Sequence, residues 1–174
     1  MPTFPTLPTA RLTSPFGWRT HPITGVTTFH SGIDLAPEVS GTTGVPIFAA
    51  QRGTVMRNQY NSSMGNYIMI KHLDDSYTTH YLHLASSNVI VGQIVEMADQ
   101  IGIMGTTGNS TGIHLDFGVS TAYPTVFGSS GTYVDPLVYL ENALEVDPED
   151  PTGSYDPEIY KDIPGRRKHI RRRY

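Results

Sequence analysis

The sequence predicts an all-β fold made of short antiparallel strands, and three observations lead to this class. Between residues 11 and 141, short apolar or alternating runs are separated by clusters of Gly, Asn, Asp and Ser. The chain of 174 residues contains 17 glycines and 13 prolines, a proportion typical of turn-rich β proteins. Only residues 136–144 carry apolar side chains at helical spacing, with Pro136 suited to the first turn of a short C-terminal helix.

Seven runs have the composition of strands. In chain order they cover residues 46–50, 54–60, 66–72, 77–82, 94–96, 101–104 and 113–120. The polar segments 61–65 and 73–76 are typical of hairpin connections between neighbouring strands. We therefore expect one domain at residues 11–144, an antiparallel sheet followed by the helix.

Two further regions flank this domain. Residues 1–10 place proline at every third position from Pro2 to Pro8, which favours an extended arm outside the core with no hydrogen-bonded partner. Residues 145–174 begin acidic and proline-rich and end basic, and such a tail cannot fold by burying apolar surface alone. The basic end could bind an acidic partner, the acidic tract or RNA, or remain a solvated charged end.

Charge and composition exclude several classes of function. The net charge is −4, but six of the twelve basic residues lie in the last nine positions, so residues 1–165 carry six basic and sixteen acidic side chains. A body with a net charge of −10 is not expected to bind nucleic acid. Cysteine is absent, which excludes disulfides, thiolate-bound zinc and a thiol nucleophile. Neither a membrane span nor a signal peptide is expected.

The histidines carry the most information about chemistry, because six of the seven lie within residues 21–114. His30 and Asp34 bracket a glycine that lets the chain bend, so both side chains can face one ion. His114 and Asp116 belong to an alternating run, in which a period of two puts them on one face and their apolar neighbours on the other. Each pair alone is a weak signal, but together they indicate a metal site.

A third cluster contains His80 and His83. These side chains either take part in the chemistry or form the polar side of a half-buried strand. His21 and His72 lie outside these three clusters, and we expect them to be structural. Tyr81 is expected to share a strand face with His83, and it either lines a groove or packs as an ordinary tyrosine.

Ordered motifs extend over residues 12–140. They are TSPFGWR at 13–19, HPITG at 21–25, FHSGIDLA at 29–36, GVPI at 44–47, GTV at 53–55, GNY at 65–67, YLHL at 81–84, GTTGNSTG at 105–112 and DPLVYL at 135–140. In these motifs the chain resembles the lysostaphin-like zinc endopeptidases, which cut peptide bridges in bacterial peptidoglycan. The resemblance implies an antiparallel sheet that forms a groove, of the duplicated hybrid motif type.

The resemblance also implies the roles of five residues around one zinc ion. His30 and Asp34 correspond to metal ligands, and His83 and His114 correspond to the catalytic pair. Asp116 occupies the position of the third metal ligand, which is histidine in the family's usual pattern. The substrate implied is a cross-bridge or stem peptide of peptidoglycan.

An aspartate at this position changes the site. With one histidine and two aspartates around zinc the formal charge is zero instead of +1, so the ion is a weaker Lewis acid and harder divalent ions such as Mn²⁺ or Ca²⁺ become suitable. Carboxylates still bind zinc directly. Two functions follow: a working metalloendopeptidase with Asp116 as ligand, or a structural or wall-binding protein of the same fold that holds peptide without cutting it.

The expected setting is a bacteriophage. Without a signal peptide, a wall hydrolase has to be carried to the wall, as a tail component of a virion is during infection, or released to it by phage lysis. A fragment of a larger secreted protein would have the same sequence features. The arm at residues 1–10 and the tail at residues 145–174 are then expected to contact other phage tail proteins.

Overall fold

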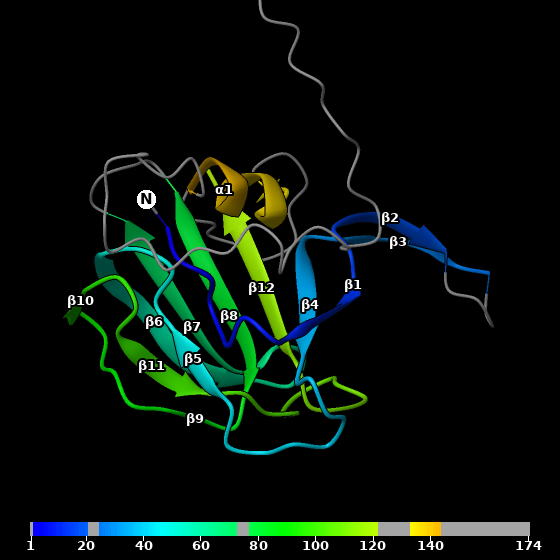
Figure 1. Ribbon diagram of the computed structural model, residues 1–174, viewed down its shortest axis with the longest axis horizontal. Coiled ribbons are helices and arrows are strands. Elements are labelled where there is room, and N and C mark those ends of the chain that lie inside the picture. Colours follow the sequence, from blue (N-terminus) through cyan, green and yellow to red (C-terminus); the bar gives the residue numbers. More distant parts are fainter. Residues whose placement is uncertain (1, 21–24, 73–76, 122–132, 144–174) are drawn as a thin grey trace, which may run out of the picture.

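The computed structural model describes residues 2–20, 25–72, 77–121 and 133–143 (Figure 1). These residues form thirteen strands and one helix. They are β1 (Arg11–Ser14), β2 (Gly17–Thr20), β3 (Thr27–His30), β4 (Gly32–Ala36), β5 (Pro46–Phe48), β6 (Gly53–Asn61), β7 (Gly65–His72), β8 (Thr78–Leu84), β9 (Ser86–Ser87), β10 (Ile94–Val95), β11 (Gln100–Ile103), β12 (Leu115–Ser120), β13 (Tyr133–Val134) and α1 (Pro136–Ala143). The predicted all-β class is confirmed.

The strands form one large antiparallel sheet and two small ones. The large sheet has the order β1-β4-β12-β8-β7-β6-β10, and β13 also pairs with β12. A three-stranded sheet contains β5, β11 and β9, and β2 pairs with β3 in a separate hairpin that projects from the body (Figure 1). Consequently β4, β12 and β8, which carry the candidate site residues or end next to them, are neighbours in the middle of the large sheet.

The core lies on one face of this sheet. Alternation along β12 buries Leu115 and Phe117 completely and leaves Asp116 partly exposed on the other face, as the period of two predicts. On β4, Ile33 and Leu35 are buried in the same core cluster. The helix α1 contacts β12 and β4, and its Tyr139 is buried and donates a hydrogen bond to Gln51 Oε1 at 2.8 Å.

The long hairpin of β6 and β7 agrees with the prediction to within one residue at each end. Its turn at residues 61–65 is stabilised by Asn61, whose Oδ1 accepts hydrogen bonds from the backbone N–H groups of Ser63 and Met64 at 2.9 and 2.7 Å. The predicted turn at 73–76 lies outside the described residues. So do Leu144, the last residue of the predicted helix, and the tail at 145–174.

The N-terminal segment corrects one expectation, because residues 3–6 are hydrogen-bonded to the domain. Thr3 N–H donates to Ala50 O at 2.5 Å, Phe48 N–H donates to Pro5 O at 2.9 Å, and Thr6 Oγ1 donates to Pro46 O at 2.9 Å. Proline lacks an N–H, but its carbonyl still accepts a hydrogen bond, so the proline spacing does not prevent this pairing.

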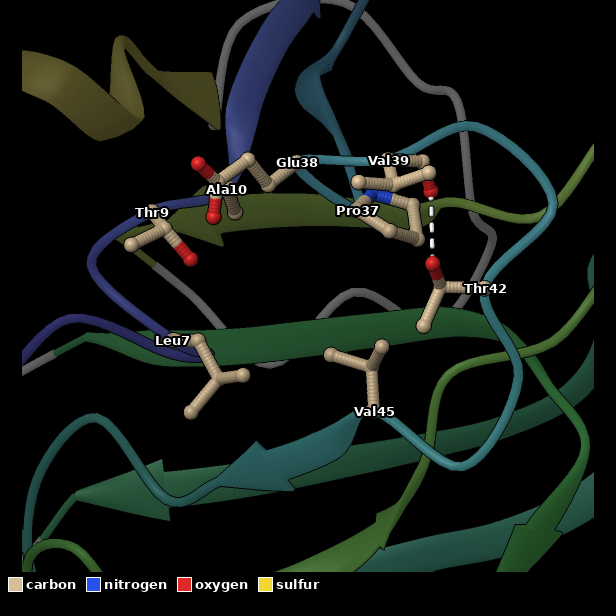
Figure 2. A pocket seen from close by; sticks show the side chains of 8 residues that line it. All are labelled: Leu7, Thr9, Ala10, Pro37, Glu38, Val39, Thr42 and Val45. Atoms are coloured by element: carbon tan, nitrogen blue, oxygen red, sulfur yellow. Dashed lines mark hydrogen bonds between the residues drawn. The ribbon is translucent and has the colours of Figure 1, made fainter.

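A pocket of about 210 Å³ lies beside this segment (Figure 2). It is lined by Leu7, Thr9, Ala10, Pro37, Glu38, Val39, Thr42 and Val45.

No helix among the described residues is long and apolar enough to cross a membrane.

Candidate metal centre

Two carboxylates face each other across neighbouring strands. Asp34 on β4 and Asp116 on β12 are direct partners in the antiparallel register, so their side chains project from the same face. Both side chains are largely buried, with 18% and 17% of their surface exposed. Like charges placed directly opposite each other destabilise a sheet, so a positive group between the two carboxylates would stabilise this arrangement.

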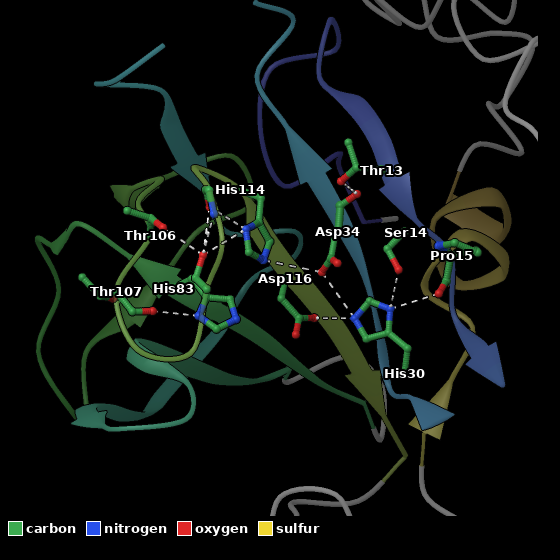
Figure 3. A network of polar contacts seen from close by, with 12 residues as sticks. Thr13, Ser14, Pro15, His30, Asp34, His83, Thr106, Thr107, His114 and Asp116 are labelled. Atoms are coloured by element: carbon green, nitrogen blue, oxygen red, sulfur yellow. Dashed lines mark hydrogen bonds and ion pairs between the residues drawn. The ribbon is translucent and has the colours of Figure 1, made fainter. Parts of the chain in front are cut away.

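His30 provides the third side chain of the cluster. It ends β3, and after Ser31 the chain continues into β4, which places the imidazole over the two carboxylates (Figure 3). Its Nε2 lies 3.3 Å from Asp34 Oδ1 and 3.6 Å from Asp116 Oδ1. Its Nδ1 lies 3.0 Å from Pro15 O, and because a carbonyl only accepts, Nδ1 carries a proton and Nε2 is the nitrogen available to a metal.

The donor atoms of His30, Asp34 and Asp116 fit a small divalent cation. One ligand atom from each residue lies within 4.8 Å of the other two. A tetrahedral zinc ion with bonds of about 2.0–2.2 Å separates its ligand atoms by about 3.3–3.6 Å. The two distances from His30 Nε2 fall in this range, so the residues predicted as ligands are brought together in a geometry that can hold zinc.

Gly32 makes room for the site. A Cβ atom at this position would lie 2.7 Å from Phe117 O and would collide with the Asp116 carboxylate. Gly32 is therefore needed for the close approach of the two strands. It is the first residue of β4 and has no positive φ, so its role is to leave space and not to bend the chain.

The cluster shifts the pKa values of its members. Burial lowers the pKa of His30, but hydrogen bonds to Asp116 and Asp34 and the charges of both carboxylates outweigh it and raise that pKa from 6.5 to about 10. Burial raises the pKa of Asp34, but the hydrogen bond and charge of His30 and the charges of His114 and Arg19 lower it overall. In the metal-free protein an imidazolium therefore stands between the carboxylates.

We expect metal binding at pH 8 to release about one proton from His30. The reason is that pH 8 lies between the ordinary pKa of 6.5 and the raised pKa of about 10, so the metal-free imidazole is still protonated. Its raised pKa also stabilises the metal-free fold fully below pH 6.5, and this stabilisation is lost as the pH rises through about 10. Calorimetric titration with Zn²⁺ in two buffers of different ionisation enthalpy measures the released protons, and a value near zero would contradict this charge state.

His83 and His114 lie next to each other beside the cluster. Their ring centroids are 4.8 Å apart, and His114 Nε2 lies 3.7 Å from Asp34 Oδ1. His83 Nδ1 bonds to Thr107 O at 2.8 Å, and His114 Nδ1 bonds to Gly112 O at 2.8 Å (Figure 3). Since both partners are carbonyls, both Nδ1 atoms are protonated donors, and in each neutral ring Nε2 is left as a proton acceptor.

The backbone of His83 explains its position. It has a φ of +63°, which is uncommon for a residue other than glycine, and its N–H donates to Met64 O at 2.9 Å. This conformation interrupts the alternation of β8, so Tyr81 does not share the environment of His83. Tyr81 is fully buried against Phe117, and its hydroxyl oxygen accepts a hydrogen bond from Ala50 N–H at 2.8 Å. Of the two alternatives for Tyr81, groove lining is wrong and packing is correct.

The remaining histidines of the sheet are structural. His72 is buried and bonds to Arg52 O and Thr79 Oγ1 at 3.2 and 3.0 Å, which confirms its structural assignment. His80 is fully buried, and its Nε2 lies 2.9 Å from Ser120 Oγ. Strand β8 is therefore buried along its length, and the alternative of a half-buried strand is wrong. His21 lies outside the described residues.

Sequence reasoning did not identify Arg19 as a member of the site. Its Nη1 lies 3.7 Å from Asp34 Oδ2 and also bonds to Ser14 Oγ. Ser14 Oγ in turn lies 3.4 Å from His30 Nδ1. The available signal was the motif at 13–19, which contains Ser14 and Arg19 but has no histidine.

Comparison with known families and proteins matches the part of the chain that contains the five candidate site residues. The model of peptidase family M23 matches residues 28–136. Peptidoglycan DD-endopeptidase ShyC of Vibrio cholerae is 41% identical over 99 residues, which cover 57% of this chain and 22% of ShyC. The chain spans less than a third of the length of ShyC and of two other curated relatives that it matches.

Solved structures with the same fold include two peptidases and one further M23 protein. A zinc-containing peptidase from Vibrio cholerae has a TM-score of 0.59 and 36% identity, over 67% of this chain and 35% of that one. The catalytic domain of lysostaphin from Staphylococcus simulans has a TM-score of 0.62 and 27% identity, over 76% and 92%. A mutant catalytic domain of the prophage-encoded protein EnpA from Enterococcus faecalis has a TM-score of 0.60 and 29% identity, over 79% and 95%. The predicted lysostaphin-like fold is confirmed.

Proposed function

The chain belongs to peptidase family M23, and we propose that it is a metal-dependent endopeptidase that cleaves cross-bridge or stem peptides of bacterial peptidoglycan. One observation carries the proposal. Three side chains that could hold one metal ion and two histidines with available Nε2 atoms meet on one face of the sheet. The similarity to ShyC, whose name describes a peptidoglycan DD-endopeptidase, supports the choice of substrate.

His30, Asp34 and Asp116 would hold the metal through one nitrogen and two oxygens. A zinc ion there would polarise the scissile carbonyl and make a bound water more acidic. Two carboxylates neutralise the charge of a divalent ion, so this water is less acidic than with a second histidine, and Mn²⁺ also suits the oxygen donors. Because this chain has Asp116 where the family's usual pattern has histidine, we expect the wild-type enzyme to be slow and to accept several divalent metals.

His83 and His114 would move the protons of the reaction. A water molecule attacks the amide carbonyl, and its proton passes to an unprotonated Nε2. The amide C–N bond then breaks, and the same proton is returned to the leaving amine. Hydrogen bonds from the rings to Thr107 O and Gly112 O hold both Nε2 atoms toward the metal cluster, so neither ring has to rotate during the reaction.

We expect the Asp116→His variant to cleave cell walls faster than the wild-type protein, because a neutral ligand leaves more positive charge on the metal. The measurement is release of new amino groups from purified walls, with metal content determined by elemental analysis. Asp99→His, which changes an exposed aspartate, is the matched control and should leave the rate unchanged. If neither the wild-type protein nor Asp116→His releases amino groups while both bind metal, the structural or wall-binding function is correct instead.

We also propose that the protein acts in a bacteriophage, as a tail component that opens the wall during infection. The similarity to the catalytic domain of prophage-encoded EnpA supports this setting. An antibody against the protein should label the tail tip of purified phage particles. Detection of the protein only in the lysate, and not on the particles, would contradict a place in the particle.

A further inference from the structure

We propose that Arg19 binds a carboxylate of the substrate peptide next to the scissile amide. This inference rests on the proposed function and specifies its substrate class. An endopeptidase that uses Arg19 in this way prefers peptides with a free carboxylate beside the bond that is cut. Oligoglycine bridges, which carry no such group, would be poor substrates.

The β2–β3 hairpin directs Arg19 toward the metal cluster. In the antiparallel register Gly17 is opposite His30 and Arg19 is opposite Thr28. Alternation therefore places Arg19 and His30 on the same face of the hairpin. The distance of 3.7 Å between Arg19 Nη1 and Asp34 Oδ2 agrees with this placement.

The opposite face of the hairpin is aromatic. Trp18 pairs with Phe29 there, with their ring centroids 5.5 Å apart. Phe29 also contacts Phe16, which packs against the core. This contact connects the aromatic face of the hairpin to the core, on the side of the hairpin away from Arg19.

The guanidinium of Arg19 retains capacity for a ligand. Its side chain is 47% exposed, whereas Asp34 beside it is only 18% exposed. Both contacts that it makes with described residues use Nη1. Nε and Nη2 carry three further N–H donors, in the planar fork that matches a carboxylate.

The charges around the site give this cation a purpose. Asp34 and Asp116 would repel an anionic peptide that approaches the cluster. Among the residues that the structure describes, Arg19 is the one arginine or lysine within 4.0 Å of these carboxylates. A single half-exposed contact of 3.7 Å adds little to stability, so stabilisation of the fold does not explain why an arginine is placed here.

The experiment compares Arg19→Gln with Arg52→Gln. Arg52 is a matched control, since its side chain is 43% exposed and its ion pair with Glu96 involves no site residue. Two synthetic peptides share one sequence and differ only in a carboxylate or a carboxamide beside the scissile amide. Binding of each peptide to the metal-free full chain is measured by calorimetry, and hydrolysis is measured separately with the zinc-loaded protein.

We expect the wild-type protein and Arg52→Gln to bind the carboxylate peptide more tightly than the carboxamide peptide. Arg19→Gln should lose about 10-fold or more in affinity for the carboxylate peptide and little for the carboxamide peptide. Arg19→Lys keeps the positive charge but not the planar fork of donors, so its affinity for the carboxylate peptide should lie between those of the wild-type protein and Arg19→Gln.

Equal binding of both peptides by the wild-type protein would overturn the role of Arg19. An equal loss for both peptides in Arg19→Gln would also overturn it, because the residue would then act only on the architecture of the site. If the wild-type protein discriminates between the peptides but hydrolyses neither with zinc bound, the proposed function fails and the role of Arg19 stands.

Discussion

Replacement of His30 by alanine is expected to abolish metal binding. His30 supplies the one nitrogen ligand of the cluster, and its Nε2 contacts the carboxylates of Asp34 and Asp116 at 3.3 and 3.6 Å. Without it the two carboxylates face each other with no imidazole to share a cation. Loss of a group that is only hydrogen-bonded to a metal ligand already costs about 10–100-fold in metal affinity, so loss of the ligand itself should cost more than about 100-fold.

The measurement for His30→Ala is zinc content after gel filtration, together with calorimetric titration of Zn²⁺ into the metal-free protein. We expect about one ion per wild-type chain and close to none per variant chain. Circular dichroism checks that the sheet is retained. Full retention of zinc by a folded His30→Ala protein would show that the ligands are wrongly assigned.

Substitution of His83 is expected to have the opposite pattern, with metal binding kept and hydrolysis lost. His83 is not a member of the three-residue cluster, but its ring lies 4.8 Å from that of His114. Removal of a general base or acid lowers a rate by about 10²–10⁴-fold. Asparagine is the suitable replacement, because the φ of +63° at this position disfavours most other side chains.

For His83→Asn we measure kcat on a peptidoglycan peptide and the zinc content of the same sample. The expected result is a kcat about 10²–10⁴-fold below that of the wild-type protein, at an unchanged metal content. A normal kcat would remove His83 from the reaction. Loss of zinc would instead place His83 among the ligands.

The sequence predicted best the strands whose local pattern and turn chemistry agree. The β6–β7 hairpin has long apolar runs and a turn in which Asn61 caps two backbone N–H groups, so its limits could be read almost to the residue. The face assignment of β12 was also correct, because Leu115 and Phe117 alternate with His114 and Asp116.

The strands that carry the metal ligands were harder to predict. β4 is five residues long and includes Gly32 and Asp34, which are both depleted in strands, so its pairing with β12 determines its conformation. β2 and β3 are largely exposed and pair only with each other, so burial gives them no alternating pattern. Tertiary contacts override local preference at these positions.

Motifs in the sequence indicated the five site residues, and the structure brings all five to one face of the sheet. The sequence could not indicate the groups that orient them, because Pro15, Thr107 and Gly112 act through backbone carbonyls, which any residue has. Nor could it show that the β2–β3 register directs Arg19 toward Asp34. Such partners become visible only once the chain is folded.

The most direct test of the metal centre is anomalous diffraction at the zinc edge from crystals of the zinc-loaded protein. We predict one strong peak at bonding distance, about 2.0–2.2 Å, from His30 Nε2 and from a carboxylate oxygen of both Asp34 and Asp116. A peak elsewhere, or a peak bonded to His30 and Asp34 with Asp116 beyond bonding distance, would contradict the proposed His-Asp-Asp centre.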